Sequence, residues 1–311
     1  ASLTHHGCRA SQRLILRLGA STFLGLPLAS KEAERFDAAF EALVQAPFSL
    51  VRLPVPGLPW ARAMAARKYL RATLRTLIPA RRAAGGEDFF SRMVAAMDGL
   101  MTSWTEDDLI NHFIFLILAA HNPTTSMLAA MAEALADHPE WQERVREEML
   151  ALGGPSLSFE ALGQMPQTQW VLKEVLRLTA PLGFILRRTT APLEWMGYTI
   201  PAGANVGVAP AVAMRSAEVY SNPERFDPER FAPHRAEDAV HPYAWAPFGG
   251  GAHRCIGMHF AQMQAKVFFF HLLTRYRLEP LRDAPAVRWK QVPLATPIGG
   301  VPLRLVPLAA S

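Results

Sequence analysis

The segment Phe248-Gly-Gly-Gly-Ala-His-Arg-Cys-Ile-Gly257 decides how this sequence is interpreted. Its three consecutive glycines let the backbone turn tightly and approach a flat group, because no Cβ stands in the way. Cys255 comes just before an apolar helical pattern, where free backbone amides and the helix dipole favour a thiolate over a thiol. The segment therefore predicts one reactive sulfur beside a glycine-rich turn.

The local pattern leaves three interpretations of Cys255 open: a nucleophile, an axial metal ligand, or a buried and inert thiol beside a turn. Zinc is disfavoured, because no second cysteine or histidine pair lies at ligand spacing. A dinucleotide loop is disfavoured as well, because the glycines do not follow the G-x-G-x-x-G spacing.

The composition predicts an ordered, globular protein. Half of the 311 residues are hydrophobic and 19% are charged, which provides a sizeable core and argues against a disordered chain. The net charge of +5 is spread along the chain without a run of five basic residues, so we expect no nucleic-acid partner. The two cysteines, Cys8 and Cys255, are too far apart to suggest a disulfide framework. We therefore expect a reducing compartment, the cytoplasm.

The sequence predicts no transmembrane segment and no signal peptide. Its most apolar stretches, Phe113–Ala120 and Val267–Leu273, are much shorter than the roughly 20 residues that span a bilayer. The N-terminus has no basic region followed by a long apolar core. It also lacks an initiator methionine, so we expect a fragment or a processed product.

Residues 1–180 are expected to be helical, and their clearest helix begins within Trp104-Thr-Glu-Asp-Asp-Leu109. Thr105 can cap the first amides, Asp108 can reach back as the acidic member of a capping box, and Trp104 can pack onto Leu109. No strong stop follows until Asp137-His-Pro139, so the helix can run for about 32 residues, or about 48 Å. A helix of this length predicts a buried, central element.

The rest of the chain predicts a mixture of helices and small sheets within one domain over residues 1–311. A further helix is expected to start at about Pro139, because Trp141, Val145 and Met149 recur every four positions, and another is expected at about Met165–Leu178. Residues 181–247 should form short strands (193–200 and 205–209) and a proline-rich meander (222–233). Residues 248–276 should form the cysteine loop and a helix over Ile256–Tyr276, and residues 277–311 the last strands. The fold class is mainly α with small β-sheets.

Four motifs in order give the sequence its resemblance to a known family. The cysteine segment fits F-x-x-G-x-x-x-C-x-G, the haem-binding loop of the cytochrome P450 family. Glu174-Val-Leu-Arg177 resembles its E-x-x-R motif, and Pro228-Glu-Arg-Phe231 resembles its P-E-R-F motif. Ala119-Ala-His-Asn-Pro-Thr-Thr125 resembles the A-G-x-D/E-T-T stretch of its long central helix. The similarity to soluble bacterial members runs from about residue 15 to the end of the chain.

The resemblance implies a haem b cofactor with Cys255 as the iron ligand, shielded by Phe248, within the loop that also holds Gly251 and Gly257. It implies a buried structural network of Glu174, Arg177 and Arg230. Arg187 and His253 are expected to bind the haem propionates. Arg188 is an alternative to Arg187, because neighbouring residues of a strand face opposite ways and the sequence does not fix the register.

The central helix departs from the family pattern at the acid and threonine that relay protons. These positions hold Asn122 and Pro123. Asparagine does not titrate, and proline has neither a hydroxyl nor an amide hydrogen. Pro123 leaves the carbonyl of Ala119 without its helical donor and is expected to kink the helix. Thr124 or an ordered water is expected to replace the relay in part, with poor coupling of electrons to product; a normal reaction through the kink and a water chain is the alternative.

The resemblance implies a monooxygenase that inserts one oxygen atom into a small apolar organic substrate. Electrons would come from NAD(P)H through a separate reductase and a ferredoxin- or flavodoxin-type donor. Substrate contacts are expected from Phe113–His121 and from Pro297-Ile-Gly-Gly300. We expect a monomer whose chain lacks the early elements of the family fold. A peroxide-driven haem oxygenase or isomerase and a non-catalytic haem-binding protein are the alternatives.

Overall fold

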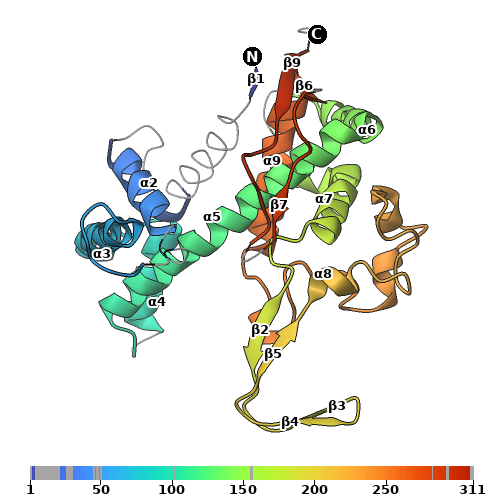
Figure 1. Ribbon diagram of the computed structural model, residues 1–311. Coiled ribbons are helices and arrows are strands. Elements are labelled where there is room, and N and C mark those ends of the chain that lie inside the picture. The colour runs from blue at the N-terminus through green and yellow to red at the C-terminus, as the bar shows by residue number, and fades with distance from the viewer. Residues whose placement is uncertain are drawn as a thin grey trace. The chain divides into compact units, whose positions relative to one another are not determined.

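The computed structural model describes residues 2–3, 22–25, 31–44, 46, 49, 51–100, 103–154, 157–281, 283–291 and 294–308. They fall into two compact units, Arg9–Asn122 and Ala1–Cys8 with Pro123–Ser311. Cys8 lies outside the described residues. The prediction of a mainly helical protein with small sheets is confirmed, as Figure 1 shows.

The described part of the unit Arg9–Asn122 is helical. It contains α2 (Lys31–Val44), α3 (Pro59–Ala84), α4 (Phe89–Gly99) and the first half of α5 (Glu106–Asp137). Apolar residues three or four positions apart on α3 are buried, as in an amphipathic helix: Ala63, Ala66, Leu70, Leu74 and Ile78. The rings of Phe90 on α4 and Phe113 on α5 meet edge to face at 4.8 Å, which ties the two helices into one core.

The helix α5 begins with the capping box that the sequence predicts. The Thr105 hydroxyl accepts a hydrogen bond from the Asp108 amide at 3.2 Å, and the Asp108 carboxylate accepts one from the Thr105 amide at 2.9 Å. These bonds satisfy amides that have no partner inside the helix, so the helix starts at Glu106. Trp104 packs against the cluster that contains Leu109, and its ring stacks on His112 at 4.4 Å.

By length and composition alone, α5 could cross a membrane, and it is the one such helix in the described part of the chain. The apolar stretch noted in the sequence, Phe113–Ala120, is shorter than this helix, because α5 continues past His121 and Asn122 to Asp137 and is 32 residues long in all. Of its most apolar 18-residue window, 56% is buried inside the protein, and the core helix of a soluble protein passes the same test.

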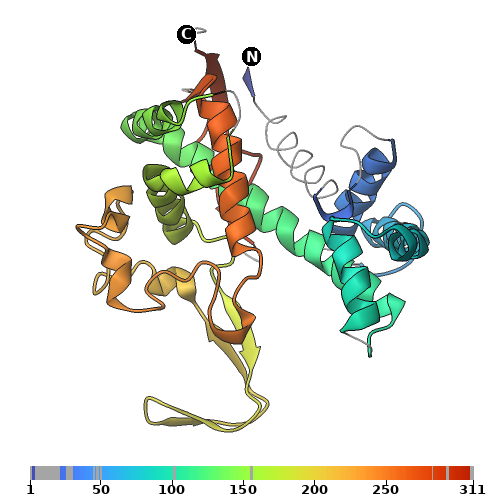
Figure 2. The same cartoon turned by 180° about the vertical axis from the view of Figure 1, so that it is seen from behind.

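The unit of Pro123–Ser311 combines helices with small antiparallel sheets (Figure 2). Its longer helices are the second half of α5, α6 (Pro139–Ala151), α7 (Pro166–Leu178) and α9 (Met258–Leu273), with the short α8 (Pro210–Ala213). Its paired strands are β2 (Ile185–Arg188) with β5 (Asn205–Val208), β3 (Leu193–Trp195) with β4 (Tyr198–Ile200), and β7 (Trp289–Lys290) with β8 (Thr296–Pro297). A separate three-stranded sheet has the order β1 (Ser2–Leu3), β9 (Leu303–Pro307), β6 (Tyr276–Pro280).

Most of these elements lie where the sequence predicts them, but α9 is shorter at both ends. The predicted helix Ile256–Tyr276 is observed as Met258–Leu273. Gly257 is the residue before its first turn, and the Thr274 hydroxyl donates to the Phe270 carbonyl at its end. Tyr276 instead begins β6 and pairs with Pro307, a long-range contact that the local pattern does not reveal.

Candidate functional site

The cysteine loop connects the proline-rich meander to α9. The Cys255 amide donates a hydrogen bond of 2.9 Å to the Phe248 carbonyl, which closes the loop across its neck. Where the chain enters the loop, the Gly249 amide donates to the Ala246 carbonyl at 3.0 Å, and inside it the Arg254 amide donates to the Gly251 carbonyl at 3.1 Å. Cys255 is a free, exposed thiol two residues before Gly257. The loop therefore presents a sulfur to solvent on a closed backbone turn.

Two glycines give this loop its path. Gly249 and Gly251 adopt φ angles of +68° and +65°, a left-handed conformation that other residues adopt only with strain. A Cβ at Gly251 would meet nothing within 4 Å, so open space lies beside the backbone there. A Cβ at Gly257 would lie 3.9 Å from the Cys255 sulfur. The backbone beside Gly251 is therefore open, whereas the Tyr243 ring lies against the neighbouring Gly250.

Strand β2 lies against the loop through Ile185, whose Cδ1 is 3.7 Å from the position of a Cβ at Gly249. Arg187, two residues along β2, shares the face of Ile185, whereas Arg188 points to the opposite face. The Arg188 guanidinium donates to the Gly203 carbonyl at 3.0 Å. Arg187 is exposed and donates to the carbonyl of the preceding Leu186 at 2.9 Å. Arg187 therefore lies on the loop-facing side of the strand.

His253 and Phe248 differ in solvent exposure. His253 is exposed within the short 3-10 turn Gly251–His253. Phe248 is half-buried, and its ring meets the ring of Trp245 edge to face at 5.9 Å. Trp245 was not singled out from the sequence, although an aromatic residue three positions before Phe248 is the signal that could have found it.

Glu174, Arg177 and Arg230 form a fully buried ionic network beneath the meander. The Glu174 carboxylate accepts two hydrogen bonds from Arg177, at 2.7 and 2.9 Å, and one from Arg230 at 3.1 Å. It also accepts the Asp227 amide at 2.8 Å. Arg177 donates further to the Met214 carbonyl at 2.9 Å. The network therefore joins α7 to two points of the meander.

A second carboxylate, Glu237, completes the charge balance and was not predicted. It accepts hydrogen bonds of 2.6 Å from both Arg230 and Arg235, and one of 2.8 Å from the Ser221 hydroxyl. Burial raises the pKa of Glu237, but the hydrogen bonds from Arg235, Ser221 and Arg230 outweigh it, so the pKa falls to about 2. Two buried guanidiniums thus face two carboxylates.

The three predicted relay positions are consecutive on α5, and the helix runs through them without a break. Asn122 and Pro123 are half-buried and Thr124 is buried. Pro123 has no amide hydrogen to donate to the Ala119 carbonyl. Two residues after Thr124, the Ser126 hydroxyl donates to the Ala295 carbonyl at 2.5 Å, which attaches the segment before β8 to the helix.

The stretches expected to contact substrate carry exposed apolar side chains. Phe115 on α5 is 69% exposed, although Phe113 beside it is buried. Ile298, after β8, is 55% exposed, and the glycines that follow it adopt φ angles of +82° and +88°.

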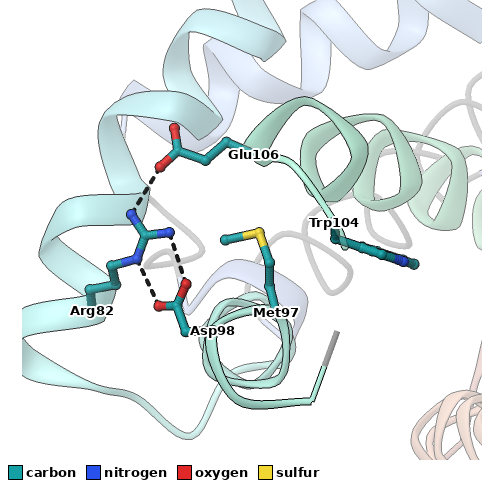
Figure 3. A pocket seen from close by; sticks show the side chains of 5 residues that line it. All are labelled: Arg82, Met97, Asp98, Trp104 and Glu106. Atoms are coloured by element: carbon teal, nitrogen blue, oxygen red, sulfur yellow. Dashed lines mark hydrogen bonds and ion pairs between the residues drawn. The ribbon is translucent and has the colours of Figure 1, made fainter. Parts of the chain in front are cut away.

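A hollow of about 310 Å³ in the unit Arg9–Asn122 contains none of the predicted site residues (Figure 3). The guanidinium of Arg82 bridges two carboxylates there, Asp98 at 2.7 and 2.9 Å and Glu106 at 2.9 Å. The hydrogen bond from Arg82 lowers the pKa of Asp98. Because these charges satisfy one another, the hollow is better explained as the junction of α3, α4 and α5 than as a ligand site.

Comparisons with known proteins show the family of this chain. The family model for cytochrome P450 matches residues 22–298. Cytochrome P450 136 of Mycobacterium tuberculosis is 36% identical over 300 residues, which cover 96% of this chain and 61% of the relative. A sterol 14alpha-demethylase of Mycolicibacterium vanbaalenii is 38% identical over 178 residues, covering 57% of this chain and 39% of the relative.

The structure of cyanobacterial CYP120A1 with bound retinoic acid resembles this fold with a TM-score of 0.86 and 28% identity, covering 97% of this chain and 69% of that one. The chain belongs to the cytochrome P450 family, as the four motifs predict. It spans about three fifths of the length of the Mycobacterium tuberculosis relative.

The residues around Cys255 fit the haem that this family carries. A haem-thiolate site needs one unpaired sulfur with room for a flat macrocycle beside it. Cys255 is a free and exposed thiol, and no side chain fills the space at Gly251. Arg187 adds a cation on the adjacent strand face.

Proposed function

We propose that this chain is a haem-thiolate monooxygenase of the cytochrome P450 type that inserts one oxygen atom into a small apolar organic substrate. The observation that carries the proposal is the exposed thiol of Cys255, presented on a closed glycine loop within the region that matches the family. When bound, the haem supplies an iron at which dioxygen is activated by electrons and protons.

The residues of the loop would hold and orient the cofactor. Cys255 would be the iron ligand, and the hydrogen bond between its amide and the Phe248 carbonyl keeps the sulfur at one place on the loop. The Phe248 ring would exclude water from the sulfur. Arg187 and His253 would bind the propionates, and the face that Arg187 shares with Ile185 supports it over Arg188.

The proton path would involve Asn122, Pro123 and Thr124. The amide of Asn122 can hold a water by hydrogen bonds but cannot release a proton at neutral pH. The Ala119 carbonyl, which Pro123 leaves without a helical donor, offers an acceptor for such a water. Electrons would come from NAD(P)H through a separate reductase and a ferredoxin- or flavodoxin-type protein in the cytoplasm.

A reduced carbon-monoxide difference spectrum tests the proposal. The purified chain is loaded with hemin and compared with Cys255→Ala, which removes the sulfur. We expect a Soret band at the thiolate position for the wild type and its loss in the variant. A wild type that takes up no haem, or a band that survives the substitution, would overturn the assignment.

A peroxide-driven haem oxygenase is the second candidate, and the pair Asn122-Pro123 favours it. Hydrogen peroxide already carries the two electrons that dioxygen would obtain from a redox partner and the two protons that it would obtain through a relay. Product formation from a panel of apolar substrates should then occur with hydrogen peroxide and not with a ferredoxin, its reductase and NADPH. Turnover with the ferredoxin system would favour the monooxygenase.

A further inference from the structure

We propose that Lys173 and Trp245 are positioning residues for the cysteine loop: together they fix the ring of Phe248 and, through it, the surroundings of the Cys255 sulfur. The inference rests on the proposed function, because it concerns the sulfur that would bind the haem iron. It is carried by contacts between α7, the segment before the loop, and the loop itself.

The first contact joins Trp245 to α7. The indole Nε1 of Trp245 donates a hydrogen bond of 2.9 Å to the Lys173 carbonyl. The ammonium of the same lysine lies 5.3 Å from the centre of the Trp245 ring and 4.5 Å from the centre of the Phe231 ring, within the range of cation–π attraction. One lysine therefore holds the indole through both its backbone and its side chain.

The Lys173 ammonium is itself held by an ion pair with Asp238. Both side chains are about one fifth exposed, so water screens the pair only in part. The neighbouring residue Ala244 is fixed independently, because the hydroxyl of the buried Tyr220 donates to its carbonyl at 3.0 Å. The segment that enters the loop is thus anchored at two successive residues.

The second contact carries the position of Trp245 into the loop. Its ring meets the Phe248 ring edge to face, with 5.9 Å between the ring centres and 62° between the planes. The Phe248 carbonyl accepts the amide hydrogen of Cys255 at 2.9 Å. A displaced indole would free the Phe248 side chain, and the residue that closes the neck of the loop would lose its support.

Loss of the contact between Trp245 and Phe248 would alter the surroundings of the Cys255 sulfur more than the stability of the fold. Lys173 is next to Glu174 in sequence, but Glu174 binds Arg177 and Arg230 in the buried network, which does not need the indole. Partners that lie behind a ligand orient it and tune its electron donation. Once the exposed Cys255 sulfur has bound haem, a mobile Phe248 would let water return to it, weaken its donation to iron and favour its protonation.

Two variants test the contributions of Trp245 and Lys173 separately. Trp245→Leu removes the ring that contacts Phe248, and Lys173→Met removes the ammonium but keeps the apolar stem and the backbone carbonyl. The matched control is Trp289→Phe. The Trp289 indole donates a hydrogen bond of 2.8 Å to Glu133, and neither residue belongs to the cysteine loop. Trp245→Phe, which keeps an aromatic ring, serves if the leucine variant does not fold.

The measurement is the rate at which the Soret band of the reduced carbon-monoxide complex moves from the thiolate to the thiol position. We expect Trp245→Leu to accelerate this conversion about tenfold, Trp245→Phe and Lys173→Met about threefold each, and Trp289→Phe by less than a factor of two. A Trp245 variant that converts no faster than Trp289→Phe would overturn the proposal.

Amide hydrogen exchange of the haem-free protein provides a second readout. The Cys255 amide, which donates to Phe248, should exchange about tenfold faster in Trp245→Leu, whereas the amides of α7 should not change. If the wild type shows no thiolate band, the proposed function fails, and the exchange rates still decide the positioning role. Unchanged protection of the Cys255 amide would overturn that role.

Discussion

The guanidinium of Arg177 donates two hydrogen bonds to the carboxylate of Glu174, at 2.7 and 2.9 Å, and neither side chain is exposed to solvent. Such a pair is held at both of its bonds and cannot exchange one of them for water. Because Glu174 also accepts from Arg230, both of these buried arginines share its carboxylate. The stability of the meander should therefore depend on its charge.

Glu174→Gln should lower the free energy of unfolding by about 3–5 kcal/mol, because it leaves a buried guanidinium without a counter-charge. Urea unfolding followed by circular dichroism measures the change. The matched control is Glu279→Gln, which removes one partner of the exposed pair with Arg304 and should cost at most about 1 kcal/mol. Equal losses of free energy of unfolding in the two variants would show that the buried Glu174 network stabilises the protein no more than an exposed ion pair does.

Glu237 should make the stability of this unit depend on acid. Its pKa is about 2 in the folded protein against an ordinary value of 4.5, because the hydrogen bonds from Arg235, Ser221 and Arg230 outweigh the cost of burial. A lowered pKa stabilises the fold fully above pH 4.5, and this contribution is lost as the pH falls toward 2. The thermal midpoint of the wild type should therefore fall more steeply over this range than that of Glu237→Gln.

The comparison of the two proteins removes the effect of other carboxylates, which titrate in both. The difference between their midpoints should be largest near neutral pH and should shrink below pH 4.5. Parallel curves from pH 7 to pH 2 would contradict the role of Glu237.

The capping box of α5 gives a prediction for the unit Arg9–Asn122. Thr105→Ala removes the hydroxyl that accepts from the Asp108 amide and should cost about 1 kcal/mol of stability. Thr105→Ser keeps the hydroxyl and should lie within a few tenths of a kcal/mol of the wild type. Thermal unfolding of the three proteins checks this, and equal midpoints for the alanine and serine variants would show that the cap is not needed.

The capping box could be predicted from the sequence because all of its partners lie within four residues. The same holds for the starts of α6 and α7, each of which has a proline at its first helical position. The C-terminal end of α9 could not be predicted, because Tyr276 joins a strand whose partner is Pro307. Local pattern reports local structure, and the pairing of β6 with β9 is a long-range choice.

The candidate site also has features that the local sequence predicts and features that depend on long-range contacts. The spacing of Phe248, Gly251, Cys255 and Gly257 identified the loop, because the motif is continuous in sequence. The anchor of that loop was not visible, since Lys173 and Trp245 are 72 residues apart. The choice between Arg187 and Arg188 was also open, because it depends on the contact between Ile185 and Gly249.

That contact predicts different effects for the two arginines. Arg187→Gln should weaken haem retention, because it removes a cation from the strand face next to the loop. Arg188→Gln removes a hydrogen bond to Gly203 on the other face and should leave retention unchanged. The measurement is the rate of haem transfer to an excess of apomyoglobin, with an expected increase of about fivefold for Arg187→Gln alone. A larger effect of Arg188→Gln would reverse the assignment.

The sequence Asn122-Pro123 predicts how efficiently electrons are used. Neither side chain can deliver a proton, so part of the reducing equivalents should be lost as peroxide or water. The double substitution Asn122→Asp with Pro123→Thr restores an acid and a hydroxyl, and it should raise the product formed per NADPH consumed severalfold. Thr124→Ala in the wild-type background should lower that ratio if Thr124 carries part of the relay. Haem content and the reduced carbon-monoxide spectrum serve as controls for each variant. A ratio that stays constant across the three proteins would mean that the proton reaches the iron by a path independent of this stretch of α5.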